Sequence, residues 1–347
     1  MLKKNNSYKG GAEEFRGFIR LSSNENSYGP ANSVISQIKK NAEFSNIYPE
    51  INSQSLIKKI SIYNNIKEEN IIVGAGSDEI LQMIFHAFTT PGDYVMYSKY
   101  SFAMYKIFAK AFKCKSIIYN DSQFQFSLDE FKKQYSSKVK IIFIANPNNP
   151  TGAIFYKKDL LNFIKSINKK TIIVLDSAYS EYILDTNYSD GLEFVKKFNN
   201  VIVTKSFSKI YSLGGLRIGW GYGHSNIIKK LYQVKKPFNV NRLATVAAIE
   251  SLKNSNWLKK NVKLNQNNKN FLINNLKNKK FEIIDTLANF VLLKCKSENM
   301  ANLLSLFAMK NKITVRPLIS YGLKSYIRMT VGTSSEMKNV VKVFNKF

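Results

Sequence analysis

A lysine in a loop of small hydroxyl residues is the part of this sequence best suited to chemistry. Residues 204–209 are TKSFSK, and residues 214–217 are GGLR. Serine hydroxyls and an arginine can bind a phosphate, and glycines let the backbone approach it closely. The amine of Lys209 can form a Schiff base with an aldehyde if it is kept unprotonated, which the nearby cation of Arg217 favours. Taken alone, the segment also fits an ordinary loop between a strand and a helix.

The carboxylate of Asp176 is a second candidate group, because it comes at the end of the predicted buried strand 171–175. A carboxylate at the carboxyl end of a buried strand faces the crevice where α/β proteins bind ligands. Opposite a pyridine nitrogen, it would keep that nitrogen protonated and strengthen the ring as an electron sink. Tyr179, three residues later, can reach the same ligand. The alternative interpretation is an aspartate that caps the next helix.

Two turns that follow predicted strands add candidate ligand contacts. Residues 145–152 are ANPNNPTG, and there Asn149 can present its amide to a ring hydroxyl, although a plain turn is the alternative. Residues 74–79 are GAGSDE and join a strand to a helix, so the backbone N–H groups at Ser77 and Asp78 form an anion site. A dinucleotide fingerprint is strongly disfavoured because Glu79 stands where its third glycine belongs.

The candidate residues follow short β-branched runs that alternate with helix-period segments from about residue 70 to 265. Residues 141–144 and 172–175 are apolar at every position, which is typical of strands buried on both faces. We therefore predict an α/β fold with a large, mixed or parallel, seven-stranded sheet covered by helices. The predicted strands are Asn70–Gly74, Tyr94–Ser98, Lys115–Tyr119, Lys140–Ala145, Thr171–Asp176, Val201–Thr204 and Arg217–Trp220.

The chain after about residue 270 has a different pattern, which predicts a smaller α+β domain. Strands are expected at Phe281–Lys294, Ile313–Pro317 and Tyr326–Val331, and helices at Ser297–Lys310 and Ser334–Phe347. We expect residues 41–265 to form the large domain, and residues 1–40 with 266–347 to form an N-terminal arm and the small domain. The interface between two domains is a usual place for a ligand site.

Composition narrows the function classes. The net charge is +28, but only six of the 52 basic residues are arginine, and the lysines are spread along the chain. This pattern favours a solvated surface over nucleic-acid binding. Two cysteines and two histidines predict neither a disulfide framework nor a metal site. The sequence has no bilayer-length apolar run and no apolar core of a signal peptide, so we expect a cytoplasmic protein without a membrane partner.

The motifs, in their order and spacing, resemble those of fold-type-I pyridoxal-phosphate enzymes of the histidinol-phosphate aminotransferase group. The resemblance extends from Ser23–Pro30 (SNENSYGP) to Ile327–Thr333 (IRMTVGT). It implies a pyridoxal-phosphate-dependent aminotransferase with a large sheet domain and a smaller C-terminal domain. It also implies transfer of an amino group between a glutamate/2-oxoglutarate pair and a small phosphorylated amine or ketone.

The resemblance assigns most of the candidate residues to the cofactor. Lys209 matches the Schiff-base lysine that moves the proton, and Asp176 and Tyr179 complete the catalytic set. The implied cofactor contacts are Asp176 to the pyridine nitrogen, Asn149 and Tyr179 to the ring hydroxyl, Phe102 stacked on the ring, and Ser206, Ser208, Arg217, Ser77 and Asp78 around the phosphate. For Phe102, an ordinary core phenylalanine is the alternative.

Three residues carry the implied substrate and subunit contacts. Arg328 matches the arginine that binds the acidic end of the substrate, and Asn24 is expected to bind the substrate with it. One guanidinium can hold a carboxylate or a phosphate in turn. Tyr48 matches a tyrosine that reaches the cofactor phosphate of the neighbouring subunit, so a homodimer is expected.

The N-terminal segment leaves the substrate open. The stretch before Asn24 is shorter than in typical relatives, and Tyr8–Gly11 (YKGG) resembles the opening of threonine-phosphate decarboxylases. A phosphorylated three-carbon ketone, which yields aminopropanediol phosphate, and a decarboxylase of phosphorylated amino acids are therefore alternatives. A nicotinamide oxidoreductase and a nucleic-acid-binding protein are the alternatives from other classes.

Overall fold

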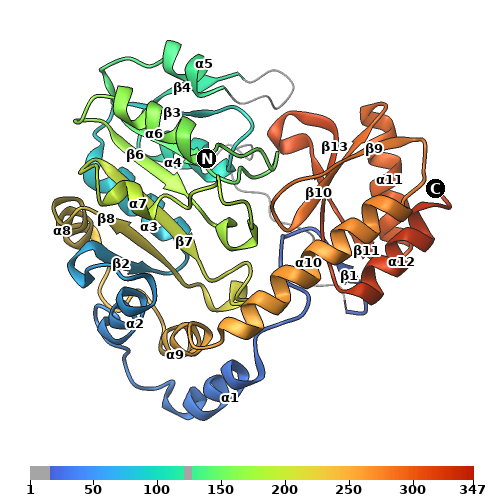
Figure 1. Ribbon diagram of the computed structural model, residues 1–347, viewed down its shortest axis with the longest axis horizontal. Helices are drawn as coiled ribbons and strands as arrows, with labels where there is room; N and C mark the ends of the chain where they lie inside the picture. Colours follow the sequence, from blue (N-terminus) through green and yellow to red (C-terminus); the bar gives the residue numbers. More distant parts are fainter. Residues whose placement is uncertain (1–15, 121–126) are drawn as a thin grey trace, which may run out of the picture.

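Seven strands form one large sheet in the computed structural model, which describes residues 16–120 and 127–347 (Figure 1). In order across the sheet they are β2 (Ile71–Gly74), β8 (Gly219–Gly223), β7 (Val201–Ser206), β6 (Ile172–Asp176), β5 (Val139–Ala145), β3 (Tyr94–Ser98) and β4 (Lys115–Tyr119). Strand β8 is antiparallel to both β2 and β7, and all other neighbouring pairs in this sheet are parallel. The predicted mixed seven-stranded sheet is confirmed.

Helices cover both faces of this sheet, which explains the unbroken apolar runs at residues 141–145 of β5 and 172–175 of β6. One face packs against α3 (Ser77–Phe88), α4 (Ala103–Ala111) and α8 (Ser225–Val234). The other packs against α2 (Gln54–Asn64), α5 (Leu128–Lys133), α6 (Lys157–Ser166), α7 (Leu192–Val195) and α9 (Arg242–Ser251). This layered arrangement leaves the ends of the strands open for a ligand.

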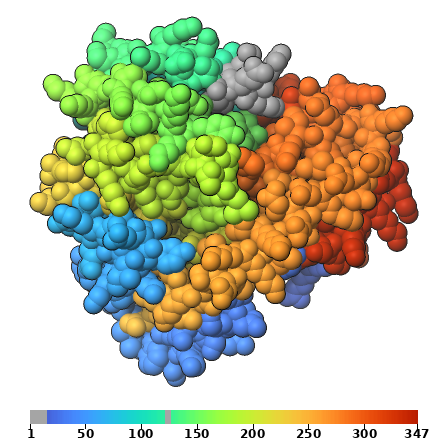
Figure 2. Space-filling view, viewed as in Figure 1, coloured from blue at the N-terminus to red at the C-terminus, as the bar shows by residue number. Residues whose placement is uncertain are grey.

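The C-terminal part forms a second, smaller core. Its antiparallel sheet has the order β12 (Arg316–Leu318), β13 (Leu323–Thr330), β10 (Phe290–Cys295) and β9 (Phe281–Ile284), packed against α11 (Glu298–Lys310) and α12 (Ser334–Phe344). The N-terminal β1 (Ile19–Arg20) pairs in parallel with β11 (Ile313–Thr314), which places residues 19 and 20 beside this core. Figure 2 shows its orange and red residues packed against the green and yellow residues of the large domain.

Three predicted strands are wrong in their bounds, for local reasons. The stretch Ile313–Pro317 is divided between β11, which pairs with β1, and β12, which pairs with β13. The stretch Phe281–Lys294 is two strands, β9 and β10, which fold back on each other and pair Phe281 with Cys295. Apolar residues fill both, so the pattern hid the turn between them. The strand expected from Arg217 begins at Gly219, because Arg217 has a φ of +56°, in the left-handed region. Short 3₁₀ turns are η1 (Ala42–Phe44), η2 (Glu68–Asn70), η4 (Ser180–Tyr182), η5 (Gly214–Leu216) and η6 (Ile319–Tyr321).

The helix packing bears on the expected domain boundaries. Helix α1 (Asn32–Asn41) packs against α9, and Val34 is buried in the core of the large domain. We therefore propose that the large domain begins near residue 31 rather than 41. Helix α10 (Ser255–Asn275) crosses between the domains, since Val262 lies in the large core and Leu272 in the small one. The boundary near 265 falls within this helix.

Two features are absent from residues 16–120 and 127–347. No helix there is long and apolar enough to cross a membrane. No group of three or more His, Cys, Asp or Glu side chains there could hold a metal ion. The segment Tyr8–Gly11, compared above with decarboxylases, lies outside the described residues.

Candidate active site

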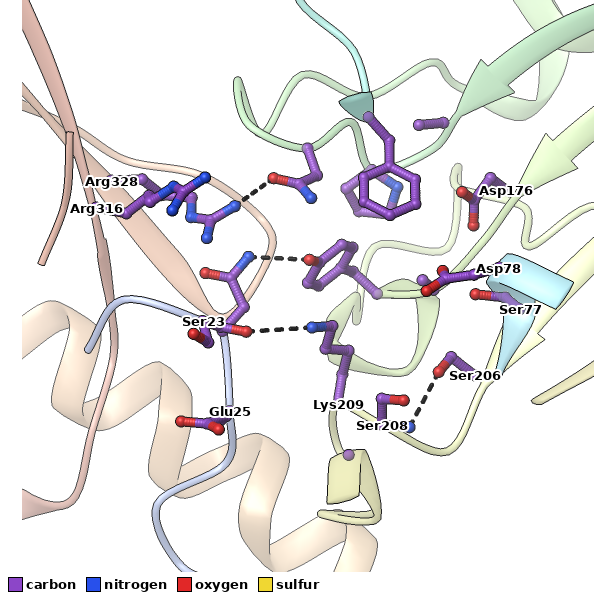
Figure 3. A pocket seen from close by; sticks show the side chains of 18 of the residues that line it. Ser23, Glu25, Ser77, Asp78, Asp176, Ser206, Ser208, Lys209, Arg316 and Arg328 are labelled. Atoms are coloured by element: carbon purple, nitrogen blue, oxygen red, sulfur yellow. Dashed lines mark hydrogen bonds between the residues drawn. The ribbon is translucent and has the colours of Figure 1, made fainter. Parts of the chain in front are cut away.

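A cavity of about 360 Å³ lies at the carboxyl ends of β5, β6 and β7, between the two domains. Ala145, Asp176 and Ser206 line it where these strands end, because the carboxyl ends of parallel strands meet at one edge of a sheet. The small domain adds Arg316 and Arg328 on the opposite wall (Figure 3). The cavity therefore forms only when both domains are in place.

The cavity brings together twelve of the thirteen residues singled out from the sequence. They are Asn24, Ser77, Asp78, Phe102, Asn149, Asp176, Tyr179, Ser206, Ser208, Lys209, Arg217 and Arg328. Tyr48 is not among the lining residues. Its side chain is 77% exposed and stacks on Phe238, with the ring centroids 4.7 Å apart. This position was expected to serve a neighbouring subunit, and the single chain does not test that role.

Lys209 stands in the loop after β7, and its amine points into the cavity (Figure 3). Its Nζ donates a hydrogen bond of 3.3 Å to the carbonyl oxygen of Ser23, and it lies 5.7 Å from the ring centroid of Tyr179. Lys209 is thus placed to bind an aldehyde and to move a proton.

Asp176 is a buried carboxylate at the end of β6, 5% exposed. Its Oδ2 accepts a hydrogen bond of 2.7 Å from the Tyr105 hydroxyl, and its Oδ1 accepts one of 3.3 Å from Thr204. Burial raises the pKa of Asp176 to about 6, against the lowering effect of these hydrogen bonds. A buried anion at this point suits a cationic ring nitrogen, which would offset its desolvation.

The raised pKa predicts how Asp176 affects the stability of the cofactor-free protein. Its carboxyl loses a proton near pH 4 in the unfolded chain but near pH 6 in the fold. Its contribution to stability is therefore present below pH 4 and is lost as the pH rises through 6, by about 3 kcal/mol. Urea unfolding from pH 4 to 8 should show Asp176→Asn gaining stability relative to the wild type. A constant difference between the two proteins would contradict this expectation.

The amino end of α3 and Arg217 form an anion site. Gly76 precedes the helix with a φ of +87°, and a Cβ there would lie 2.3 Å from Nη2 of Arg217. Only glycine lets the guanidinium lie over the start of the helix, where free N–H groups point outward. Arg217 also contacts Ser208 at 3.4 Å and Asp78 at 3.3 Å. Helix amides, hydroxyls and a guanidinium are the donor set that a phosphate requires, so these residues fit the phosphate of pyridoxal phosphate.

Two arginines face the cavity from the small-domain sheet. Arg316 on β12 and Arg328 on β13 are directly paired across the strands. Arg328 donates through Nη1 to Asn149 Oδ1 at 2.5 Å and through Nη2 to the carbonyl oxygen of Ser22 at 2.9 Å. These contacts hold the 6%-exposed guanidinium in one orientation. The pair supplies two positive charges at the end of the cavity opposite Asp176.

Asn24 connects the domains rather than standing free in the cavity. Its Nδ2 donates to the Tyr179 hydroxyl at 2.9 Å, while its backbone N–H donates to Thr330 Oγ1 at 3.0 Å. Asn289 Nδ2 donates to its carbonyl oxygen at 3.0 Å. The φ of +55° at Asn24 is one that asparagine tolerates better than most residues. Asn24 therefore orients Tyr179, a role that the sequence had not indicated.

Sequence reasoning missed several lining residues. Arg316, Tyr321, Glu25, Ser22 and Ser23 all line the cavity. The rarity of arginine could have flagged Arg316, because only six occur in the chain. The others carry no local signal, since serines, tyrosines and glutamates are common everywhere. Glu25 forms an ion pair of 3.0 Å with Arg20 at the edge of the site.

Comparisons with known proteins agree with this geometry. The family model described as "Aminotransferase class I and II" matches residues 16–344. The chain is 37% identical to the histidinol-phosphate aminotransferase of Pelagibacter ubique, over 94% of this chain and 92% of that protein. It is 36% identical to that of Caldicellulosiruptor saccharolyticus, over 94% and 91%.

Solved structures share the fold at lower identity. The histidinol-phosphate aminotransferase of Sinorhizobium meliloti, in complex with pyridoxal-5'-phosphate, has a TM-score of 0.86 and 22% identity, covering 94% of this chain and 90% of that one. The L-threonine-O-3-phosphate decarboxylase of Porphyromonas gingivalis has a TM-score of 0.82 and 21% identity, covering 95% and 99%. Both likenesses concern the fold, because their identities are low.

Proposed function

The chain belongs to the class I and II aminotransferase family, and from that premise we propose that it is a histidinol-phosphate aminotransferase. It is a pyridoxal-phosphate-dependent aminotransferase of fold type I. The finer proposal concerns its substrates, namely histidinol phosphate and the glutamate/2-oxoglutarate pair. The observation that carries it is the paired Arg316 and Arg328 at the end of the cavity.

The chain's own groups divide the work of the reaction. Bound pyridoxal phosphate supplies an aldehyde for an amine and a ring that takes up electron density. Lys209, which lines the cavity, would hold the cofactor and then move a proton at the substrate carbon. Asp176 would pair its negative charge with the ring nitrogen of the bound cofactor, and its burial would strengthen that attraction. Arg217 and the amino end of α3 would hold the phosphate.

The paired arginines support a substrate with a strongly acidic end. A phosphate carries up to two negative charges, so two guanidinium groups can match it. A carboxylate of glutamate can use Arg328 alone through a bidentate contact. One site could thus bind the phosphorylated substrate in one half of the reaction and glutamate in the other. The identity of 36–37% to two histidinol-phosphate aminotransferases supports histidinol phosphate as the phosphorylated partner.

A screen of single half-reactions tests the substrate. The holoenzyme is mixed with histidinol phosphate, aminopropanediol phosphate or phosphothreonine, and the change in cofactor absorbance and the release of carbon dioxide are recorded. Histidinol phosphate should react at least about tenfold faster than aminopropanediol phosphate, since more of the cavity would be filled. Carbon dioxide from phosphothreonine would instead favour the decarboxylase, and faster reaction of aminopropanediol phosphate would favour the three-carbon substrate.

We propose further that the protein is a homodimer. Large apolar side chains are exposed along residues 44–63, and Phe238 lies beside them; the set is Phe44, Ile47, Tyr48, Ile51, Ile62, Tyr63 and Phe238. Such a gathering is typical of a protein interface. The sequence match of Tyr48 to a tyrosine that serves the neighbouring subunit indicates a second copy of this chain as the partner.

If the protein is a homodimer through this surface, one substitution there should weaken both dimerisation and cofactor binding. Ile47→Glu places a charge in this surface, so we expect a monomer in sedimentation and weaker retention of pyridoxal phosphate. Leu306→Glu is the matched control, because Leu306 is 61% exposed on α11 in the small domain. Monomers in the wild type, or equal effects of the two substitutions, would contradict the proposal.

A further inference from the structure

The Tyr105 hydroxyl is the strongest contact that the structure gives to Asp176. It donates to Oδ2 at 2.7 Å, whereas Thr204 donates to Oδ1 at 3.3 Å. Tyr105 is fully buried, and burial together with the negative charge of Asp176 raises its pKa well above the ordinary value. The hydroxyl therefore stays protonated and remains a donor at all physiological pH values.

The surroundings of Tyr105 fix the direction of this hydrogen bond. The ring stacks on Phe143 of β5 at a centroid distance of 4.9 Å and meets Phe102 edge-on at 5.9 Å. Phe102 caps α4 and lines the cavity, and Tyr105 lies three residues later, on the first turn of that helix. The start of α4 therefore carries both the aromatic wall of the cavity and the donor to its buried carboxylate.

We propose that Tyr105, assisted by Thr204, is a positioning residue that keeps the Asp176 carboxylate ionised and correctly oriented toward the cofactor ring. This inference rests on the proposed role of Asp176. A buried carboxylate is costly in its charged form, and each hydroxyl donor stabilises the anion relative to the acid. Two other groups act on the same carboxylate: the backbone N–H of Ala178 lowers its pKa, and the negative charge of Asp78 on α3 raises it. Without Tyr105, Asp176 would hold its proton at higher pH and attract a ring nitrogen less.

The test compares Tyr105→Phe with Tyr97→Phe in the holoenzyme. Tyr97 is also buried, and its ring lies 6.3 Å from that of Tyr105, but its hydroxyl donates to Ser116 on the neighbouring strand, away from Asp176. Both substitutions remove one buried hydroxyl and keep the ring. For Tyr105→Phe we expect kcat to fall and the dissociation constant of pyridoxal phosphate to rise, each by about tenfold to a hundredfold. KM for the amino donor should stay within about twofold, because no substrate contact is removed.

The pH dependence of the cofactor absorbance separates positioning from a structural effect. Its acid limb should move to higher pH in Tyr105→Phe and stay in place in Tyr97→Phe. In an Asp176→Asn background, Tyr105→Phe should add little further loss, because the charge it stabilises is gone. Equal losses in both backgrounds, or an unmoved acid limb, would overturn the inference.

Two further outcomes are informative. Should Asp176→Asn alone leave cofactor affinity and kcat unchanged, the role of Asp176 itself fails, and this inference falls with it. If Tyr105→Phe cannot be purified as a folded protein, Thr204→Val removes the weaker donor to the same carboxylate. That variant should give the same shifts at a smaller size, and an unchanged pH profile would overturn the inference.

Discussion

Replacing Lys209 with alanine is expected to lower kcat by at least about 10⁴-fold, the upper range for loss of a proton-transferring group. Lys209→Arg should be equally inactive, because arginine keeps the positive charge but cannot lose its proton to act as a base. Turnover of glutamate with the phosphorylated ketone measures the effect. Lys229→Ala, on the exposed face of α8, is the control and should keep full activity.

The neighbouring Lys205 makes this prediction specific. It lies four residues earlier in the same segment, but its ammonium contacts Asp190 at 2.7 Å and Glu181 at 3.2 Å. Burial alone would lower the pKa of Lys205, yet these two carboxylates raise it above the ordinary value. A lysine held as a paired ammonium cannot attack an aldehyde. Borohydride reduction of the holoenzyme should therefore attach the cofactor to Lys209, and a label on Lys205 would contradict the assignment.

The convergence of Asn149, Asp176 and Lys209 could be predicted from the sequence for a simple reason. Asp176 ends a predicted buried strand, Asn149 and Lys209 follow two others, and the carboxyl ends of parallel strands meet at one edge of a sheet. The order of motifs was therefore enough, without knowledge of the side-chain contacts. The same rule placed Ser206 and the loop after β7 at this edge.

Other parts of the site depend on contacts that no local pattern encodes. Tyr105 meets Asp176 across 71 positions of the chain, and Asn24 meets Tyr179 across 155. Arg316 reaches the cavity because β12 pairs with β13 in a register that sets it beside Arg328. Cross-strand register and helix packing determine which of these distant side chains come into contact. A residue pattern shows only that each of them is buried or exposed.

The fold was predictable where periodicity was strong and less so where the backbone departs from regular geometry. The left-handed φ of Arg217 delays the start of the predicted strand to Gly219, and the same conformation turns its guanidinium over the start of α3. The misplaced strand boundary and the proposed phosphate contact thus have one cause. Unusual backbone conformations gather at functional sites because the rest of the fold holds them there.

Replacing Arg328 with glutamine is the second substitution with a large expected effect. Its guanidinium is buried, fixed by Asn149 and Ser22, and faces the cavity, so a bound acid would lose a paired, charge-assisted contact. A loss of about 3 kcal/mol corresponds to a roughly 100-fold rise in KM for glutamate and for the phosphorylated substrate. Steady-state kinetics on both substrates measure it, with Arg16→Gln as an exposed control.

The substitution Arg316→Gln should affect binding of the phosphorylated substrate and of glutamate differently. If a phosphate engages both guanidinium groups while a carboxylate uses Arg328 alone, this variant should raise KM for the phosphorylated substrate about tenfold and change that for glutamate little. Arg328→Lys adds a further distinction, because lysine keeps the charge but loses the planar fork, so it should restore phosphate binding better than carboxylate binding. Equal effects of Arg316→Gln on both substrates would show that the pair does not distinguish them, and the argument for a phosphorylated substrate would lose its structural support.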